Sequence, residues 1–160
     1  MKNFLITGVK FLFFTPVALL SVAVLYFFYC EANKAYWDYR VKEMCLKDGG
    51  VTVYEKVKLT KEERNQLRFR DVSHVTSDDV YYSEFDNETI KNGTPEVFKM
   101  TLFIYRNNDQ KLLGKKVTYG RRGGDFPSGI AHPSSYSCNQ IKGLDTNIEL
   151  SIFTTEGDQL

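Results

Sequence analysis

The pattern of apolar and polar residues divides the chain into two unequal parts. From Phe11 to Tyr29, 19 consecutive residues include no charged side chain. At about 1.5 Å of rise per residue, a helix of this length spans the roughly 30 Å hydrocarbon core of a bilayer. The sequence after Tyr29 is polar, charged and patterned like a folded domain. We therefore predict a leader and one transmembrane helix over residues 1–30, followed by a single domain over residues 31–160, here called the head.

The apolar run is predicted to be a permanent anchor rather than a cleaved signal sequence. Lys2 and Lys10 precede or open it, as in a signal, but signals have a shorter apolar segment of about 7–15 residues and small residues at the cleavage site. This run ends in aromatic residues, which are also too bulky for the lipid-attachment box that Cys30 would need. Tyr and Trp favour the headgroup level of a membrane. The residues expected to define the anchor and its contact with membrane lipid are Phe11, Pro16, Leu20, Tyr26, Tyr29 and Trp37.

Residues 31–46 are predicted to form a helix continuous with the anchor. Trp37, Val41, Met44 and Cys45 recur at the spacing of one helix face, so this stripe should be buried. An Asp-Gly-Gly sequence follows, and glycine readily adopts the left-handed conformation that ends many helices.

The rest of the head is predicted to be mainly antiparallel strands. Alternating apolar residues, separated by turn signals such as Asp86-Asn87, indicate strands at 51–59, 80–85, 96–106, 111–119 and 147–155. The last of these strands should point Ile148, Leu150 and Ile152 inward. A capping box at Thr60–Glu63 predicts a short helix to about Phe69. The expected fold class is α+β, a helix packed on an antiparallel sheet.

Two of the three cysteines suggest the compartment of the head. Cys45 and Cys138 lie near its two ends, where a disulfide would close a long loop and indicate an oxidising environment outside the cytoplasm. The alternative is a pair of buried free thiols in a cytosolic head. The short basic leader favours a head outside the cytoplasm over a cytosolic head. Cys30, at the membrane boundary, is expected to be either an inert free thiol or an intermolecular link.

The connection between Tyr119 and Asp145 is too long to be an ordinary loop, so it is expected to be ordered and functional. Arg121, Arg122 and Asp125 lie in a Gly-rich stretch that could bind an anion or a partner. Alternatively, one arginine pairs with Asp125 and with Glu55, which interrupts the apolar face of the first strand. We favour this structural ion pair, because a lone carboxylate at a buried position needs a cation.

Catalytic and metal-binding motifs are weak in this sequence. His132 lies near Ser134, Ser135 and Cys138, but catalytic partners meet in space rather than in sequence, and His132-Pro133 is more typical of a turn. No pair of His or Cys residues has metal-ligand spacing, so no metal and no cofactor are expected. The head carries all 20 acidic residues and 19 of the 21 basic ones, a net charge of −1. It therefore lacks the basic excess of a nucleic-acid-binding domain.

Three motifs carry a resemblance. The sequences Asp-Gly-Gly-Val from Asp48, Tyr-Gly-Arg-Arg-Gly-Gly-Asp from Tyr119 and His-Pro-Ser-Ser-Tyr-Ser-Cys from His132 resemble small uncharacterised envelope proteins of Gram-negative bacteria. The resemblance implies a bacterial envelope setting; with the orientation expected from the cysteines and the leader, the anchor would lie in the inner membrane and the head in the periplasm. It also implies that the two glycosylation-like sequences, Asn87-Glu88-Thr89 and Asn92-Gly93-Thr94, are ordinary turns without glycan.

The function expected from these features is a non-enzymatic one. A small, nearly neutral head on a membrane anchor is typical of an accessory subunit that binds another envelope protein or complex. An immunity or inhibitor protein against a toxin has the same profile. A membrane-tethered hydrolase that uses His132, Asp125 and the two arginines on a phosphate or ester is the third hypothesis; it requires a pocket that joins these side chains.

Overall fold

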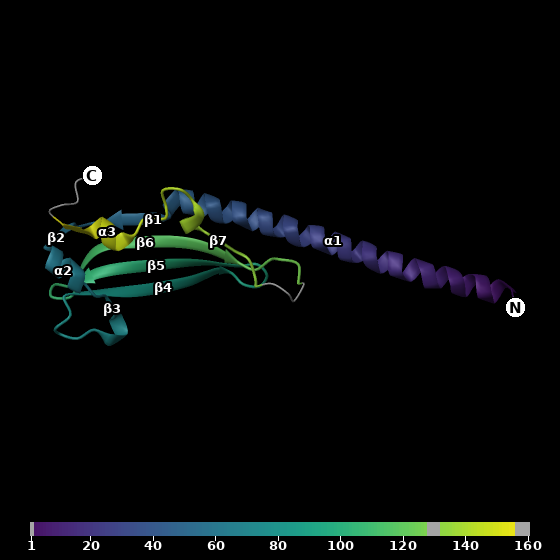
Figure 1. Ribbon diagram of the computed structural model, residues 1–160, viewed down its shortest axis with the longest axis horizontal. Coiled ribbons are helices and arrows are strands. Elements are labelled where there is room, and N and C mark those ends of the chain that lie inside the picture. Colours follow the sequence, from purple (N-terminus) through teal and green to yellow (C-terminus); the bar gives the residue numbers. More distant parts are fainter. Residues whose placement is uncertain (1, 128–131, 156–160) are drawn as a thin grey trace.

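A computed structural model describes the backbone of residues 2–127 and 132–155, and the side chains of these residues from Pro16 onwards. One long helix, α1 (Lys2–Asp48), carries a sheet-rich head on its C-terminal part, while its N-terminal part projects away from the head (Figure 1). The predicted α+β class and the continuity of the anchor with the first helix of the head are confirmed.

A six-stranded sheet forms the head, with the path β1-β6-β5-β4-β3 and β7 beside β6. Its three long strands are consecutive antiparallel neighbours: β4 (Tyr81–Lys91), β5 (Glu96–Arg106) and β6 (Lys111–Arg122). The shorter strands are β1 (Gly50–Val53), β3 (Arg70–Asp71) and β7 (Ser135–Ser137). The hairpin predicted from residues 96–119 is therefore present.

Short elements complete the head at the end away from the projecting helix (Figure 1). Strands β2 (Val57–Leu59) and β8 (Phe153–Thr155) pair in parallel as a separate small sheet. The predicted capping box begins helix α2 (Lys61–Gln66): the Glu63 N–H donates to Thr60 Oγ1 and the Thr60 N–H donates to the Glu63 carboxylate. The remaining helices are η1 (Val72–His74), η2 (Cys138–Gln140) and α3 (Ile148–Ile152).

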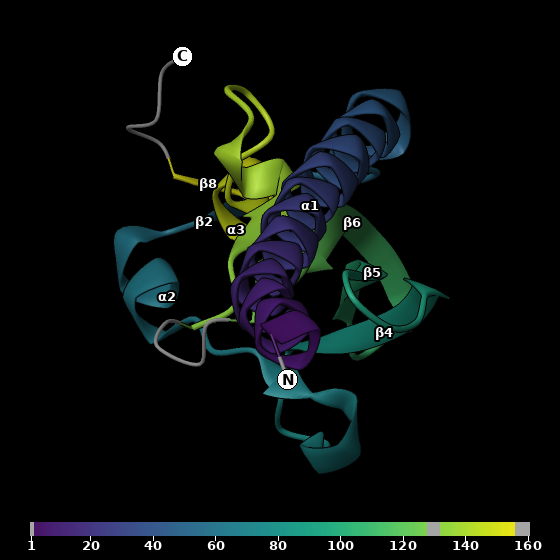
Figure 2. The same ribbon diagram turned by 90° about the vertical axis from the view of Figure 1, so that its right-hand side faces the viewer.

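The C-terminal part of α1 packs on one face of the sheet and runs along the C-terminal half of β6, and Figure 2 shows this arrangement from the side of the projecting helix. Val41 and Cys45 from the predicted stripe are fully buried there, against Val97, Val117 and Tyr119. These strand residues alternate with outward-facing neighbours, as the two-residue period of a strand requires. A second buried cluster, at the β2–β8 end, contains Ile104, Leu113, Ile148, Ile152 and Phe153.

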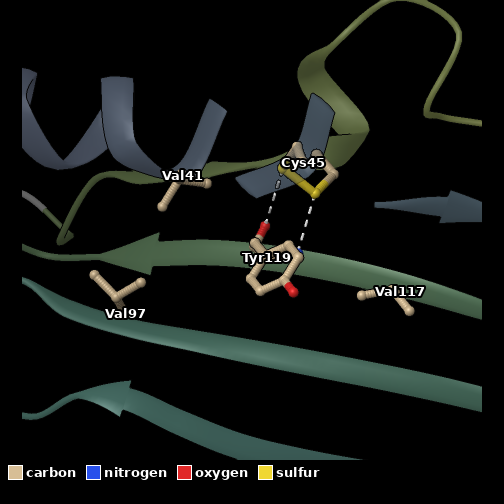
Figure 3. Close-up of a cluster of buried hydrophobic side chains, with 6 residues drawn as sticks. Val41, Cys45, Val97, Val117 and Tyr119 are labelled. Atoms are coloured by element: carbon tan, nitrogen blue, oxygen red, sulfur yellow. Dashed lines mark hydrogen bonds between the residues drawn. A yellow bond between two sulfur atoms is a disulfide. The ribbon is translucent and has the colours of Figure 1, made fainter. Parts of the chain in front are cut away.

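A disulfide joins Cys45 at the end of α1 to Cys138 in η2, with a Cα–Cα distance of 5.4 Å (Figure 3). The predicted pairing is thus present. The backbone N–H of Tyr119 donates a hydrogen bond to Cys138 Sγ at 3.0 Å. The Tyr119 hydroxyl donates to the Asp48 carboxylate at 2.7 Å, and burial together with this bond raises the pKa of Tyr119 to about 12. The disulfide therefore closes the helix-covered core at the place where α1 ends.

Three boundaries predicted from the sequence are wrong. The chain bends at Tyr54, so the strand predicted at 51–59 is split between β1 and β2 in different sheets. The Asp86-Asn87 turn does not form, because β4 continues through these residues while paired with β5. Residues 148–152 are helical: Ile148 and Ile152 are buried at helical spacing, while Leu150 is 59% exposed.

Candidate functional site

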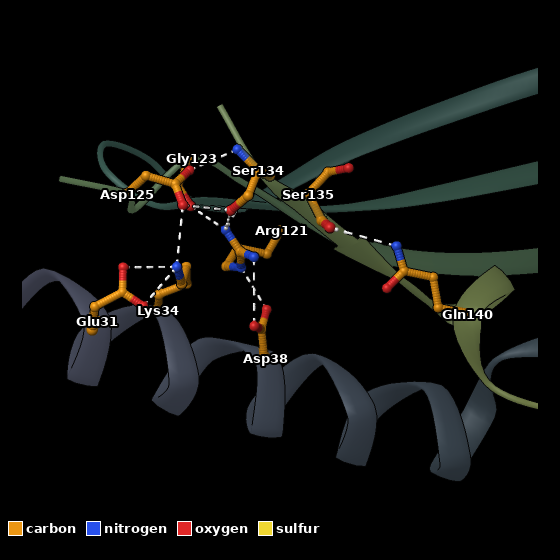
Figure 4. A network of polar contacts seen from close by, with 9 residues as sticks. All are labelled: Glu31, Lys34, Asp38, Arg121, Gly123, Asp125, Ser134, Ser135 and Gln140. Atoms are coloured by element: carbon orange, nitrogen blue, oxygen red, sulfur yellow. Dashed lines mark hydrogen bonds and ion pairs between the residues drawn. The ribbon is translucent and has the colours of Figure 1, made fainter. Parts of the chain in front are cut away.

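The long segment after β6 is held to α1 by a polar network, here called the helix–loop clamp (Figure 4). Its members are Lys34, Asp38, Arg121, Asp125 and Ser134. The Arg121 side chain is only 2% exposed, and its Nε donates to Asp38 at 2.5 Å. The rest of its guanidinium donates to the carbonyl of Gly123 and to Ser134. Arg121 is thus a fully engaged buried cation that binds the helix and the loop together.

Asp125 forms the second half of the clamp. Its carboxylate accepts hydrogen bonds from the Ser134 N–H at 2.6 Å and hydroxyl at 2.8 Å, and it pairs with Lys34 at 3.2 Å. These donors, above all the backbone N–H of Ser134, lower the pKa of Asp125 to about 2. Lys34 also pairs with Glu31 at 2.8 Å. Asp125 is therefore an anchor point for the loop backbone and stays ionised at neutral pH.

The predicted partner of Glu55 is wrong. Glu55 pairs with Arg106 and with Lys111, at 2.5 Å, and these cations lower its pKa. Neither Arg121 nor Arg122 takes part. Val53 lies opposite Gly114, and at about 3.3 Å per residue the position of Arg121 is roughly 23 Å further along β6. Glu55 is thus in an ion pair, but its partners belong to the β5–β6 hairpin and not to the long loop.

The other predicted polar residues do not converge. Arg122 has a 67% exposed side chain, lies over the Phe98 ring and is 3.9 Å from Glu96. His132 is exposed. A surface hollow of about 350 Å³ lies elsewhere, at the α2 end of the head, and is lined by residues that include Leu59, Glu63, Leu67, Asp79 and Tyr81. Among the described residues, Arg121 and Lys34, the cations around Asp125, are both bonded to protein groups.

The described part of the apolar run has the character of a membrane-spanning helix. Pro16 lies within α1, which is long and apolar enough to cross a bilayer. Leu20, Tyr26 and Tyr29 are 67%, 48% and 64% exposed. Trp37 packs against the buried cluster around Val41 and Cys45, and the Lys91 ammonium lies over its ring. Its contacts are thus with the head, whereas the sequence predicts it in an aromatic belt of the membrane. The side chain of Phe11 is outside the described residues.

The structure also reveals a surface that the sequence did not predict. In the described part of the chain, the outer edge of β4 is paired only at Tyr82 and Ser83, by the two residues of β3. Beyond them all side chains from Phe85 to Ile90 are exposed. An edge strand with free N–H and C=O groups is a template for a further strand. This edge was missed from the sequence because the strand was expected to end at a turn at Asp86-Asn87, whereas β4 continues to Lys91.

Comparisons with protein-family models, with curated proteins and with solved structures find no match to this chain. The resemblance to small Gram-negative envelope proteins stays a prediction.

The helix–loop clamp predicts a specific acid sensitivity. The pKa of Asp125 falls from 3.8 to about 2 on folding, so ionised Asp125 stabilises the folded state above pH 3.8. This contribution is lost as the pH falls through 3.8 to about 2. Asp125→Asn should therefore lower the melting temperature at pH 7, and the difference from the parent should disappear towards pH 2. A difference at pH 2 as large as that at pH 7 would contradict the role of this carboxylate.

Proposed function

We propose that this protein is a non-enzymatic, membrane-anchored interaction protein that binds another envelope protein through the free edge of β4. The single observation that carries the proposal is that exposed edge, which is long and unpaired from Phe85 to Ile90 in the described chain. Main-chain hydrogen bonds to an added strand would supply affinity, and side-chain pockets would supply specificity.

Charge on the edge favours a different protein over a second copy. Glu84, Asp86 and Glu88 alternate along β4 and share one face of the sheet. Antiparallel pairing of two such strands would place acidic side chains opposite or diagonal to one another, which is unfavourable. We therefore expect an extended partner segment with basic or neutral side chains on that face.

The proposed location is a bacterial inner membrane, crossed once by α1, with the head in the periplasm. The buried Cys45–Cys138 disulfide supports an oxidising compartment. Lys2 and Lys10 lie on the N-terminal side of the apolar run, which supports a cytoplasmic location for that side. The hydrolase alternative receives less support, because Arg121 and Asp125 are engaged in the helix–loop clamp and His132 is an exposed residue.

Photo-crosslinking from intact membranes tests the proposal. A photoreactive phenylalanine at Phe85, which is 61% exposed, should capture a specific partner. The same group at Leu150, 59% exposed but on α3, is the matched control and should not capture it. Combining the probe at Phe85 with Asp86→Lys and Glu88→Lys should abolish the product.

The identity of the captured protein separates the two interaction hypotheses. Subunits of an envelope assembly would favour an accessory factor, whereas a toxin would favour an immunity protein. Equal capture at Phe85 and Leu150, or capture that survives the charge reversal, would contradict binding at the β4 edge.

A further inference from the structure

The loop after β6 reaches down along α1 as far as the apolar run. The Phe126 ring lies 5.8 Å from the Tyr26 ring and 5.9 Å from the Phe27 ring, centroid to centroid. Both helix residues belong to the uncharged run that ends at Tyr29. Phe126 therefore lies at the height of the last turn of the predicted membrane span, and Pro127 next to it is exposed.

Polarity changes at the same height on both segments. On α1, the aromatic residues at 26–29 are followed by Cys30 and then by the first charged residue, Glu31. On the loop, Phe126 is preceded by Asp125, which pairs with Lys34 on the helix. Lys34 is five residues beyond Tyr29, about 7 Å along the axis. A single plane thus separates apolar from charged groups on two segments that are distant in sequence.

The loop is held at this depth by the helix–loop clamp. Arg121 and Asp38 pair one helical turn above Lys34 and Asp125, and the disulfide lies further along the helix. Gly124 packs on Pro95 of the β4–β5 turn, where an added Cβ would approach the proline Cβ to 3.1 Å. The β4–β5 turn is therefore held next to the segment that carries Asp125 and Phe126.

We propose that the loop after β6 is a second membrane contact, in which Phe126 and Pro127 enter the lipid interface beside Tyr26 and Phe27. The inference rests on the proposed anchoring of the chain by α1. Phe28 and Tyr29 remain 63% and 64% exposed although Phe126 covers the neighbouring side of the helix. Lipid at this depth would cover the rest of the helix circumference and the outer side of the loop, since aromatic rings favour the interface.

One consequence is a defined orientation of the head. Two contacts with the bilayer, the helix and the loop, would hold the β4–β5 turn near the membrane. The α2 end, the surface hollow and the β5–β6 turn would then face away from it. The free edge of β4 would run from the membrane side outwards, within reach of another membrane-anchored protein.

Tryptophan quenching in vesicles tests the second contact. Phe126→Trp is made in the full chain, with Phe27→Trp as the positive control and Leu150→Trp as the negative one; the parent, with native Trp37, gives the baseline. Each chain is reconstituted in phosphatidylcholine vesicles with and without brominated acyl chains. We expect a blue shift and strong loss of the added emission for positions 126 and 27, and no loss for position 150.

The outcomes separate the inference from the proposed anchoring. Quenching at 27 but not at 126 would overturn the loop contact and leave the anchor in place. A chain that does not float with vesicles, or lacks quenching at both positions, would overturn the anchor and the inference with it. Should Phe126→Trp fail to fold, Pro127→Cys in a Cys30→Ser background provides a second measurement. Its labelling by a membrane-impermeant maleimide should be slower in vesicles than in detergent; equal rates would refute the contact.

Discussion

Replacing both Cys45 and Cys138 with alanine is expected to lower the free energy of unfolding by roughly 2–5 kcal/mol, the usual cost of losing a native disulfide. The two cysteines are separated by 93 positions, so the crosslink removes much conformational freedom from the unfolded chain. Both side chains are fully buried between α1, β6 and η2, so their loss also loosens the first core. Denaturant unfolding of the full chain in detergent, followed by Trp37 fluorescence, measures the effect.

Two controls make this result specific. Cys30 is buried but not bonded, so Cys30→Ala removes a thiol without removing a crosslink and should cost much less. A reducing agent should destabilise the parent chain and leave the double variant unchanged. Trapping of free thiols in intact cells then tests the compartment. An oxidised pair before lysis supports a head outside the cytoplasm, whereas two trapped thiols would contradict it.

Local patterns in the sequence predicted those elements whose cause is local. The stripe on α1, the capping box at Thr60 and the β5–β6 hairpin each follow from residues within a few positions of one another. The segment 148–152 was ambiguous. Apolar residues at 148, 150 and 152 fit the two-residue period of a strand, but residues 148 and 152 also lie one helical turn apart. Tertiary burial of Ile148 and Ile152 selected the helix.

Long-range pairings could not be read from the sequence. Asp38 and Arg121 are 83 positions apart, and their contact depends on how α1 packs along β6. The disulfide was predictable because cysteines are few, whereas each arginine had many possible acidic partners. The contact of Phe126 with Tyr26 and Phe27 depends on the same packing of α1 along β6. The sequence singled out Arg121 and Asp125 in the long loop, but their part in binding this loop to α1 could be found only from the structure.

Replacing Arg121 with glutamine is expected to destabilise the head by about 1–3 kcal/mol, the cost of leaving hydrogen-bonded groups without their donor, because the Asp38 side chain left behind is 31% exposed and can be solvated. Arg121 is 2% exposed, and its loss leaves Asp38 and the carbonyl of Gly123 without their donor. Arg121→Lys should recover only part of the loss, because an ammonium group lacks the planar fork that reaches Asp38 and the loop together. Thermal and denaturant unfolding in detergent report the change.

A matched variant and a double-mutant cycle distinguish this role from ligand binding. Arg122→Gln changes the adjacent residue, whose side chain is 67% exposed, and should leave stability nearly unchanged. The effects of Asp38→Asn and Arg121→Gln should be non-additive, because the two side chains are in direct contact. Additive effects would contradict the Asp38–Arg121 ion pair. An Arg121→Gln variant that keeps the parent melting temperature but loses partner capture at Phe85 would instead assign Arg121 to binding. Loss of stability together with retained capture in the surviving folded fraction would establish that Arg121 fixes the loop on α1.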